Sequence, residues 1–195
     1  MGYFSVLLDL TQRRWGMVGG GPIAERRVLS LLEAGAQVTV ISPRATPVLE
    51  ALALEGRIAL QSRTYEEGDL AGAQLAFVAT AAREVNLAVA REARARGVWI
   101  NAADDPAHCT FILPAIVRRG DLTVSVATGG TSPALSRAIR EELETYLTAD
   151  YATLAALAAE ARRELRASGR AVTAEAWRRA LGPAVRRLIG AQREA

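Results

Sequence analysis

The sequence predicts an α/β fold: a parallel sheet covered by helices on both faces, then a small β-hairpin and a helical C-terminal part. Apolar strands and helices alternate over about the first hundred residues, and glycines end most of the helices. A run of three glycines, residues 19–21, joins the first strand to the first helix. The alternation stops at residues 111–128, where two apolar strands flank the turn RRGD without a helix between them, which indicates a hairpin.

The elements are expected in a definite order. Strands are apolar, short and rich in β-branched residues, and we expect them at residues 15–18, 37–42, 57–65, 74–80 and 98–104. The helices between them have apolar residues three or four positions apart and a glycine at the end, and we expect them at residues 22–34, 46–56 and 83–96. After the hairpin, the same spacing predicts helices at residues 133–147, 151–167 and 173–190, the last with a kink at 182–183.

Composition excludes several classes of protein. The 195 residues, half of them hydrophobic, suffice for one full domain and a smaller appendage. Cys109 is the only cysteine, so neither a disulfide framework nor a cysteine-based metal cage is expected, and no cluster has metal-ligand spacing. No apolar run approaches the ~20 residues of a membrane span, and the first residues lack the basic flank of a signal peptide. We therefore expect a cytoplasmic protein with no membrane segment and no resident metal.

The net charge of +3 is unevenly distributed. Residues 151–195 carry nine Arg and four Glu, whereas the first 150 residues carry fifteen Arg and seventeen acids. A basic tail of this kind fits a nucleic acid, an anionic membrane surface or an anionic small molecule. Tyr151 and Trp177 are its only aromatic residues, fewer than a single-strand binder would use, so we expect no nucleic-acid partner.

The glycine run has the spacing of a dinucleotide-binding loop. Gly19, Gly21 and Ala24 fit the pattern G-x-G-x-x-A, with Gly20 between the first two, directly after a strand and at the start of a helix. The first glycine permits the tight turn, the second lets a pyrophosphate approach the backbone, and the small third residue lets the helix pack on the strand. The helix N-terminus then offers free N–H groups to the phosphates.

Other strand ends carry polar candidates for the same site. The second strand ends at Ser42 instead of the usual acid, and a serine can still bond a ribose hydroxyl. Arg44 would suit the 2′-phosphate of NADP or would simply be solvated, so the sequence leaves NAD and NADP both open. Thr80 ends the fourth strand and is a candidate hydrogen-bonding neighbour of the cofactor.

The fifth strand ends in NAADDP, which supplies the candidate for chemistry. Asp104 is the only acid among these strand ends, and a carboxylate beside a nicotinamide is a candidate general base. We expect Asp105 instead to cap the segment that starts at Pro106. His108, the only histidine, would be a proton shuttle or a transient metal ligand, although a lone histidine in a polar loop is more often neither.

The stretch ATGGTSP permits two interpretations. Thr131 and Ser132 are N-cap candidates ahead of Pro133, which predicts a well-capped helix. Glycine-flanked amides and hydroxyls at a helix start also suit a carboxylate or phosphate, so Thr128, Gly129, Gly130, Thr131 and Ser132 form a candidate anion site. The preceding hairpin is apolar at most positions, by our interpretation on both faces, so we expect it to be covered by a second chain in a two-fold dimer.

Four stretches together resemble the precorrin-2 dehydrogenases, a family that includes stand-alone enzymes, dehydrogenase–ferrochelatases and the N-terminal half of sirohaem synthase. They are FSVLLDLTQRRWGMVGGGPIAERRV, FVATAAREVN, VWINAADDP and FILPAIVRRGDLTVSVATGGTSPALSRAIREELE. They match in order and spacing and cover roughly residues 3–150. The glycine loop and GGTSP together are far more specific than either motif alone.

The resemblance implies a Rossmann domain at residues 1–113, a dimerisation region at 114–147 and a helical domain at 148–195. It implies NAD-dependent oxidation of precorrin-2 to sirohydrochlorin on the route to sirohaem or cobalamin, with Fe²⁺ or Co²⁺ as further substrates if the chain is also a chelatase. Asp104 lies at the position of the family's essential aspartate. Pro22, Ile23, Pro43 and Arg44 fall where the family binds NAD. The implied substrate is a polycarboxylate tetrapyrrole, whose negative charge would explain the basic tail.

The competing interpretation is a Rossmann binding module that senses NAD or NADH and regulates a partner. Nothing resembling a DNA-reading helix-turn-helix precedes the glycine loop, and a sensor has no need of the acid at the end of the fifth strand. A dehydrogenase that acts on another small substrate is a further interpretation, but it does not explain GGTSP or the basic tail.

Overall fold

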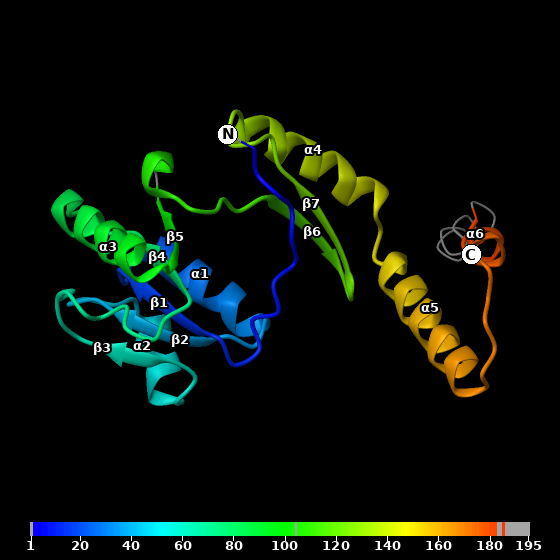
Figure 1. Cartoon of the computed structure of the whole chain (residues 1–195), viewed down its shortest axis with the longest axis horizontal. Helices are drawn as coiled ribbons and strands as arrows, with labels where there is room; N and C mark the ends of the chain where they lie inside the picture. Colours follow the sequence, from blue (N-terminus) through cyan, green and yellow to red (C-terminus); the bar gives the residue numbers. More distant parts are fainter. Residues whose placement is uncertain (1, 104, 183–184, 186–195) are drawn as a thin grey trace. The chain divides into compact units, whose positions relative to one another are not determined.

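The computed structural model describes residues 2–103, 105–182 and 185. Its contacts divide the chain into two compact units, Met1–Ile112 and Leu113–Ala195. Among the described residues, the first unit contains a five-stranded sheet with three α-helices and a 3₁₀ helix, and the second contains a two-stranded sheet with three α-helices (Figure 1). The predicted α/β class is confirmed.

All strands of the five-stranded sheet are parallel, in the order β3-β2-β1-β4-β5. This order places β1 in the middle, with β2 on one side and β4 on the other, so the chain reverses its direction of winding beside β1. The strands are β1 Arg14–Val18, β2 Gln37–Ile41, β3 Ala59–Gln61, β4 Leu75–Val78 and β5 Trp99–Ala102. The helices are α1 Pro22–Glu33, α2 Pro47–Leu54 and α3 Arg83–Arg96.

The sheet separates two apolar cores because successive strand side chains point to opposite faces. On one face Met17 and Val40 pack with Val28 of α1 and Leu49 of α2. On the other face strand residues such as Val78 pack with α3, whose Val89, Ala90 and Ala93 are buried. Burial on both faces explains why these strands are apolar at nearly every position.

The expected strand at 57–65 is much shorter in the structure, where β3 spans only Ala59–Gln61. The chain then makes turns instead of a crossover helix before β4. Arg63 holds this segment through two bonds to Asp69, of 2.8 and 2.6 Å. Glu66 N donates to the same carboxylate at 2.8 Å, so Asp69 is bonded on both oxygens.

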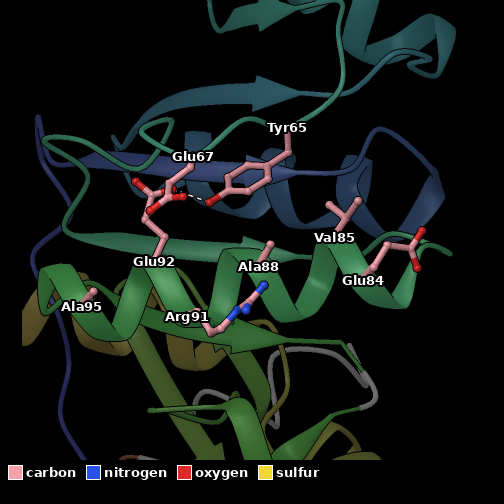
Figure 2. A pocket seen from close by; sticks show the side chains of 8 residues that line it. All are labelled: Tyr65, Glu67, Glu84, Val85, Ala88, Arg91, Glu92 and Ala95. Atoms are coloured by element: carbon pink, nitrogen blue, oxygen red, sulfur yellow. Dashed lines mark hydrogen bonds between the residues drawn. The ribbon is translucent and has the colours of Figure 1, made fainter.

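A buried carboxylate of α3 fastens the same turn segment to the sheet. Glu92 accepts a hydrogen bond from the Tyr65 hydroxyl (Figure 2). It also accepts from Arg96 Nε and from Leu70 N, the latter at 3.3 Å. Burial alone would raise the pKa of Glu92, but these bonds outweigh it and hold the pKa below its ordinary value of 4.5. A pocket of about 540 Å³ opens beside this carboxylate, lined by Tyr65, Glu67, Glu84, Val85, Ala88, Arg91, Glu92 and Ala95.

The second unit begins with an antiparallel hairpin, as the sequence predicts. Its elements are β6 Ala115–Arg119, β7 Leu122–Val126, α4 Pro133–Tyr146, α5 Asp150–Ala167 and α6 Ala174–Ala180. Arg119 joins the hairpin to the end of α4 by donating to Leu147 O at 2.6 Å and to Glu144 O at 3.1 Å. The helix expected at 173–190 ends at Ala180, and 183–184 and 186–190 lie outside the described residues.

The expectation that both hairpin faces are apolar is wrong. One face of the hairpin is apolar where Val117 pairs with Val124. Val117 is buried on that face, and α4 contacts both strands. The opposite face pairs Ile116 with Ser125 and Arg118 with Thr123, which is mostly polar. Ile116 is the apolar exception on this face, among Arg118, Thr123 and Ser125.

Burial differs sharply between the two units. All but two of the buried apolar side chains lie in the first unit; in the described part of the second unit only Val117 and Leu147 are buried. Leu135, Tyr146 and Leu157 of the second unit are more than half exposed. Within the described ranges, no helix is both long enough and apolar enough to cross a membrane.

The Glu92 network predicts a pH-dependent contribution to stability. Glu92→Ala would leave Tyr65 and Arg96 without their acceptor, and we expect a loss of about 3 kcal/mol in the free energy of unfolding. Because the folded pKa of Glu92 is depressed, this contribution is present above the unfolded pKa of 4.5 and is lost as the pH falls further. Urea unfolding of wild type and variant from pH 7 to pH 3 should show two stabilities that converge in acid. Exposed Glu67→Gln is the control, and a constant difference at all pH values would contradict the assignment.

Candidate functional site

The first two glycines of the loop are required by packing against neighbouring strand ends. Gly19 has φ +119°, and a Cβ there would lie 2.4 Å from Ala79 O, at the end of β4. A Cβ on Gly20 would lie 2.3 Å from Arg44 O, beyond the end of β2. Both distances are too short for any side chain, so the loop is closed in on two sides by backbone.

Gly21 differs because the space around its Cβ position is open. It is the N-cap of α1 and offers no side-chain acceptor to the first turn, which starts with Pro22. The backbone amides of Ile23 and Ala24 are therefore left for an external acceptor, such as the oxygen atoms of a pyrophosphate. The geometry at Gly21, an open helix N-terminus without a side-chain cap, fits the phosphates of a dinucleotide.

The segment after β2 is held against the glycine loop by its own polar groups. Thr46 N donates to Gly20 O at 3.0 Å, and the Ser42 hydroxyl donates to Arg44 O at 2.7 Å. Ser42 is buried, whereas Pro43 and Arg44 are exposed beside it. The Ser42 hydroxyl, which we expected to meet a ribose, uses its proton within the turn and can offer a ligand only an acceptor.

Thr80 forms a clamp with a residue that the sequence did not single out. Its hydroxyl lies 2.7 Å from Asn86 Oδ1, and Asn86 Nδ2 donates to Thr80 O at 3.0 Å. Ala82 N also donates to the hydroxyl, at 3.2 Å. The pair ties the segment after β4 to the first turns of α3. The sequence shows Asn86 at the end of the stretch FVATAAREVN, but it does not show that Thr80, six residues earlier, is its hydrogen-bonding partner.

Asp104 lies outside the described residues, but its chain neighbours show a firmly held loop. Ala103 N donates to Val78 O at 2.9 Å, and Cys109 Sγ accepts from Ala102 N at 3.2 Å. Thr110 also bonds to the edge of β5, because Ile100 N donates to its Oγ1 at 2.7 Å. Burial raises the pKa of the Cys109 thiol, which keeps it protonated in this role.

Asp105 does not act as the expected side-chain cap. It stands at the N-cap of the 3₁₀ turn Pro106–His108, but its Oδ2 lies 2.8 Å from His108 Nδ1. The hydrogen bond with His108 holds the pKa of Asp105 below its ordinary value. Arg83, the first residue of α3, acts in the same direction through its charge.

The GGTSP loop in the second unit is a capped helix start. Ser132 Oγ accepts from Leu135 N at 3.2 Å, and Thr128 Oγ1 accepts from Ser132 N at 3.0 Å. Thr131 closes the turn by donating to Thr128 O. Gly129 and Gly130 have φ values of +63° and +82°, and the space at both Cβ positions is open. The capping interpretation of the sequence is confirmed for Ser132, and the anion site stays a prediction.

The structure therefore brings most of the predicted cofactor residues to one edge of the sheet. Gly19, Gly20 and Gly21 lie after β1, Ser42, Pro43 and Arg44 after β2, and Thr80 after β4. The pocket beside α3 contains none of them. In the part of the chain that the structure describes, no group of three or more His, Cys, Asp or Glu side chains could hold a metal ion.

Comparison with known proteins agrees with this geometry. Residues 6–115 match the family model of putative NAD(P)-binding proteins, and residues 119–146 match the central part of sirohaem biosynthesis proteins. The structure resembles that of SirC, precorrin-2 dehydrogenase, with a TM-score of 0.75 and 28% sequence identity, over 84% of this chain and 81% of that one.

Curated relatives extend the likeness in sequence. The chain is 47% identical over 157 residues to the siroheme synthase of Methylobacillus flagellatus, covering 80% of this chain and 34% of that protein. It is 43% identical over 166 residues to the siroheme synthase of Methylococcus capsulatus, covering 85% and 35%. The chain thus spans about a third of the length of these relatives. The chain belongs to the family of putative NAD(P)-binding proteins whose model matches residues 6–115, and it is similar to a precorrin-2 dehydrogenase and to siroheme synthases.

Proposed function

We propose that this chain is a dehydrogenase that uses NAD to oxidise precorrin-2 to sirohydrochlorin. The observation that carries the proposal is the uncapped start of α1 at Gly21, open to a ligand, in a chain whose fold matches SirC, precorrin-2 dehydrogenase, over most of both lengths. The siroheme synthase relatives support the same pathway. A cytoplasmic location is part of this proposal.

The chain's own residues would divide the cofactor between three strand ends. Gly19, Gly20 and Gly21 with Pro22 and Ile23 would cradle the pyrophosphate, because the α1 amides there have no side-chain cap. Ser42, Pro43 and Arg44 would border the adenosine ribose, and Thr80 would border the nicotinamide end. NAD, when bound, supplies the acceptor for a hydride.

The substrate side of the proposal uses charge and the second unit. Precorrin-2 is a polycarboxylate, and the basic stretch 151–195 would attract it. Thr128, Gly129, Gly130, Thr131 and Ser132 would meet a substrate carboxylate through backbone amides. Residues 1–113 would form the cofactor domain, 114–147 the dimerisation region and 148–195 a helical domain.

We propose Asp104 as the base that takes the proton released in the oxidation. It follows Ala103 in the chain, and Ala103 N donates to Val78 O at the end of β4. Removal of a general base costs about 10²–10⁴-fold in rate. An aspartate that strips a proton from the tetrapyrrole would also assist insertion of Fe²⁺ or Co²⁺, which is the metal-dependent part of the proposal.

The function is tested by mixing the protein with precorrin-2 and NAD without oxygen and following NADH and the sirohydrochlorin spectrum. We expect turnover by the wild type, and for Asp104→Asn an unchanged NAD affinity with kcat lower by about 10²–10⁴-fold. Repeating the assay with Fe²⁺ or Co²⁺ tests chelation. Near-normal turnover of the variant would remove Asp104 from the mechanism, and a wild type that forms no NADH would refute the proposed function.

A charge at Gly21 should separate cofactor binding from folding. Gly21→Asp meets open space and has an ordinary backbone conformation, φ −84°, so the fold should persist. Its carboxylate would repel the pyrophosphate, and calorimetry should detect no NAD binding. Gly19→Ala is the matched comparison, because its Cβ would clash with Ala79 O and lower the melting temperature instead. Unchanged NAD affinity in folded Gly21→Asp would contradict the placement of the cofactor.

We propose a homodimer because the second unit lacks a core of its own. With only Val117 and Leu147 buried among its described apolar residues, it needs a further surface to cover Leu135 and Leu157. Sedimentation at micromolar concentration should give a dimer for wild type and a monomer for Leu135→Glu/Leu157→Glu. Leu54→Glu, at a residue 91% exposed in the first unit, is the control and should stay dimeric. A monomeric wild type would end this part of the proposal.

A further inference from the structure

Arg27 of α1 is a half-buried cation that the proposed reaction does not yet use. Its guanidinium carbon lies 5.8 Å from the centroid of the Phe77 ring, so the cation is placed over an aromatic side chain of β4. Burial lowers the pKa of Arg27, and the charge of neighbouring Arg26 acts in the same direction. Among the described residues, the Arg27 guanidinium makes no ion pair and no hydrogen bond.

The ring under Arg27 belongs to a packed aromatic cluster. Phe77 is stacked on Trp15, with ring centroids 5.3 Å apart, and Phe111 meets Phe77 edge-on at 5.5 Å. Trp15 and Phe77 are each 4% exposed. Asn101 Nδ2 donates to Phe111 O at 3.0 Å, which holds the backbone that carries the third ring. Arg27 therefore rests on a surface whose rings have little freedom to move.

The position of this cation is unfavourable for the fold taken alone. Withdrawing a guanidinium from water costs free energy unless an anion or another hydrogen-bond acceptor replaces the water. An aromatic face offsets only part of that cost. Arg26, one residue earlier, is exposed and does not meet it. The acceptor that Arg27 lacks within the described chain is therefore expected to come from a ligand.

The place of Arg27 in the first unit indicates which ligand. Phe77 is the last residue but one of β4, and the chain continues from there to Thr80, which would border the nicotinamide. An α1 side chain over β4 lies where the winding of the sheet reverses, and ligands of such sheets bind outside the strand ends at that point. The backbone amides at the start of α1 already suit the pyrophosphate. The β4 side is left for the molecule that is oxidised.

We propose that Arg27 binds a carboxylate of the tetrapyrrole substrate beside the carboxyl end of β4. The inference rests on the proposed function and deepens it, because it names a residue that anchors the substrate. A guanidinium is planar and offers paired N–H groups, which match the two oxygen atoms of a carboxylate. Contact with the Phe77 ring limits the orientations of the guanidinium before the substrate arrives.

The first test needs no ligand. Arg27→Met keeps a long unbranched side chain over Phe77 and removes the charge. Arg26→Met removes the same charge at an exposed position and is the matched control. We expect the thermal midpoint of Arg27→Met to equal or exceed that of Arg26→Met, because the fold loses a desolvated cation and no ion pair. A clearly lower midpoint for Arg27→Met would show that the fold itself needs the guanidinium, and it would overturn the inference.

The second test measures binding and turnover. For Arg27→Met we expect KM for precorrin-2 and Kd for sirohydrochlorin to rise by about tenfold to a hundredfold, which is the usual effect of losing hydrogen bonds between charged groups. The NAD affinity and kcat should stay close to wild type, because an anchor of a side-chain carboxylate binds substrate and transition state alike. Arg27→Lys keeps the charge without the planar fork and should fall between the two. Arg26→Met should bind both tetrapyrroles like wild type.

The outcomes separate this inference from the proposed function. Unchanged KM and Kd in folded Arg27→Met would overturn the role of Arg27 and leave the dehydrogenase standing. A loss of NAD affinity with KM unchanged would assign Arg27 to a cofactor phosphate and overturn the substrate contact. An equal loss of tetrapyrrole affinity in Arg26→Met would show a general effect of charge and overturn it as well. A wild type that forms no NADH from precorrin-2 would overturn the proposed function and the substrate contact together.

Discussion

The rest of the site depends on one constraint: the ends of β1, β2 and β4 meet at the glycine loop, where the backbone carries no side chains. Gly19 lies so close to Ala79 O, and Gly20 so close to Arg44 O, that any Cβ would force the ends of β4 and β2 away from β1. Backbone hydrogen bonds run through the same point, from Gly19 N to Ile41 O and from Ala79 N to Val18 O. The start of α1 and the turns after β2 and β4 are therefore positioned by one local packing requirement.

A site built in this way offers ligands mostly backbone. The hydroxyls of Ser42 and Thr80 are used to hold their own turns, and Ser132 caps α4. The start of α1, beside Gly21, has no side-chain cap, and α3 also begins without one, at Ala82. Backbone N–H groups at a helix start suit phosphates irrespective of the rest of the molecule, so this part of the site does not distinguish NAD from NADP.

The sequence predicted those features that are encoded locally. The glycine loop, the capping Ser132 and most element positions follow from neighbours in the chain, and the structure confirms them. Contacts between distant segments were not predictable: Gly20 is fixed by Arg44, 24 positions away, and β3 ends early because Tyr65 and Leu70 turn toward Glu92 of α3. The prediction that both hairpin faces are apolar failed for another reason. Ile116 lies at an exposed position of the polar face, and an apolar residue there hides the alternation of apolar and polar positions in the sequence.

The segment after β5 shows how the chain that leaves a strand can close the edge of a sheet. β5 is an edge strand, and an edge strand leaves backbone groups that invite pairing with another chain. Here the returning segment occupies that edge: Cys109 Sγ and Thr110 Oγ1 accept from Ala102 N and Ile100 N, and Thr110 N donates to Ile100 O. The bonds that close the edge also fix both ends of the loop at residues 102 and 109. The residues on either side of the loop are therefore placed by the sheet edge itself, and the same bonds that block pairing with another chain position the segment that leaves β5.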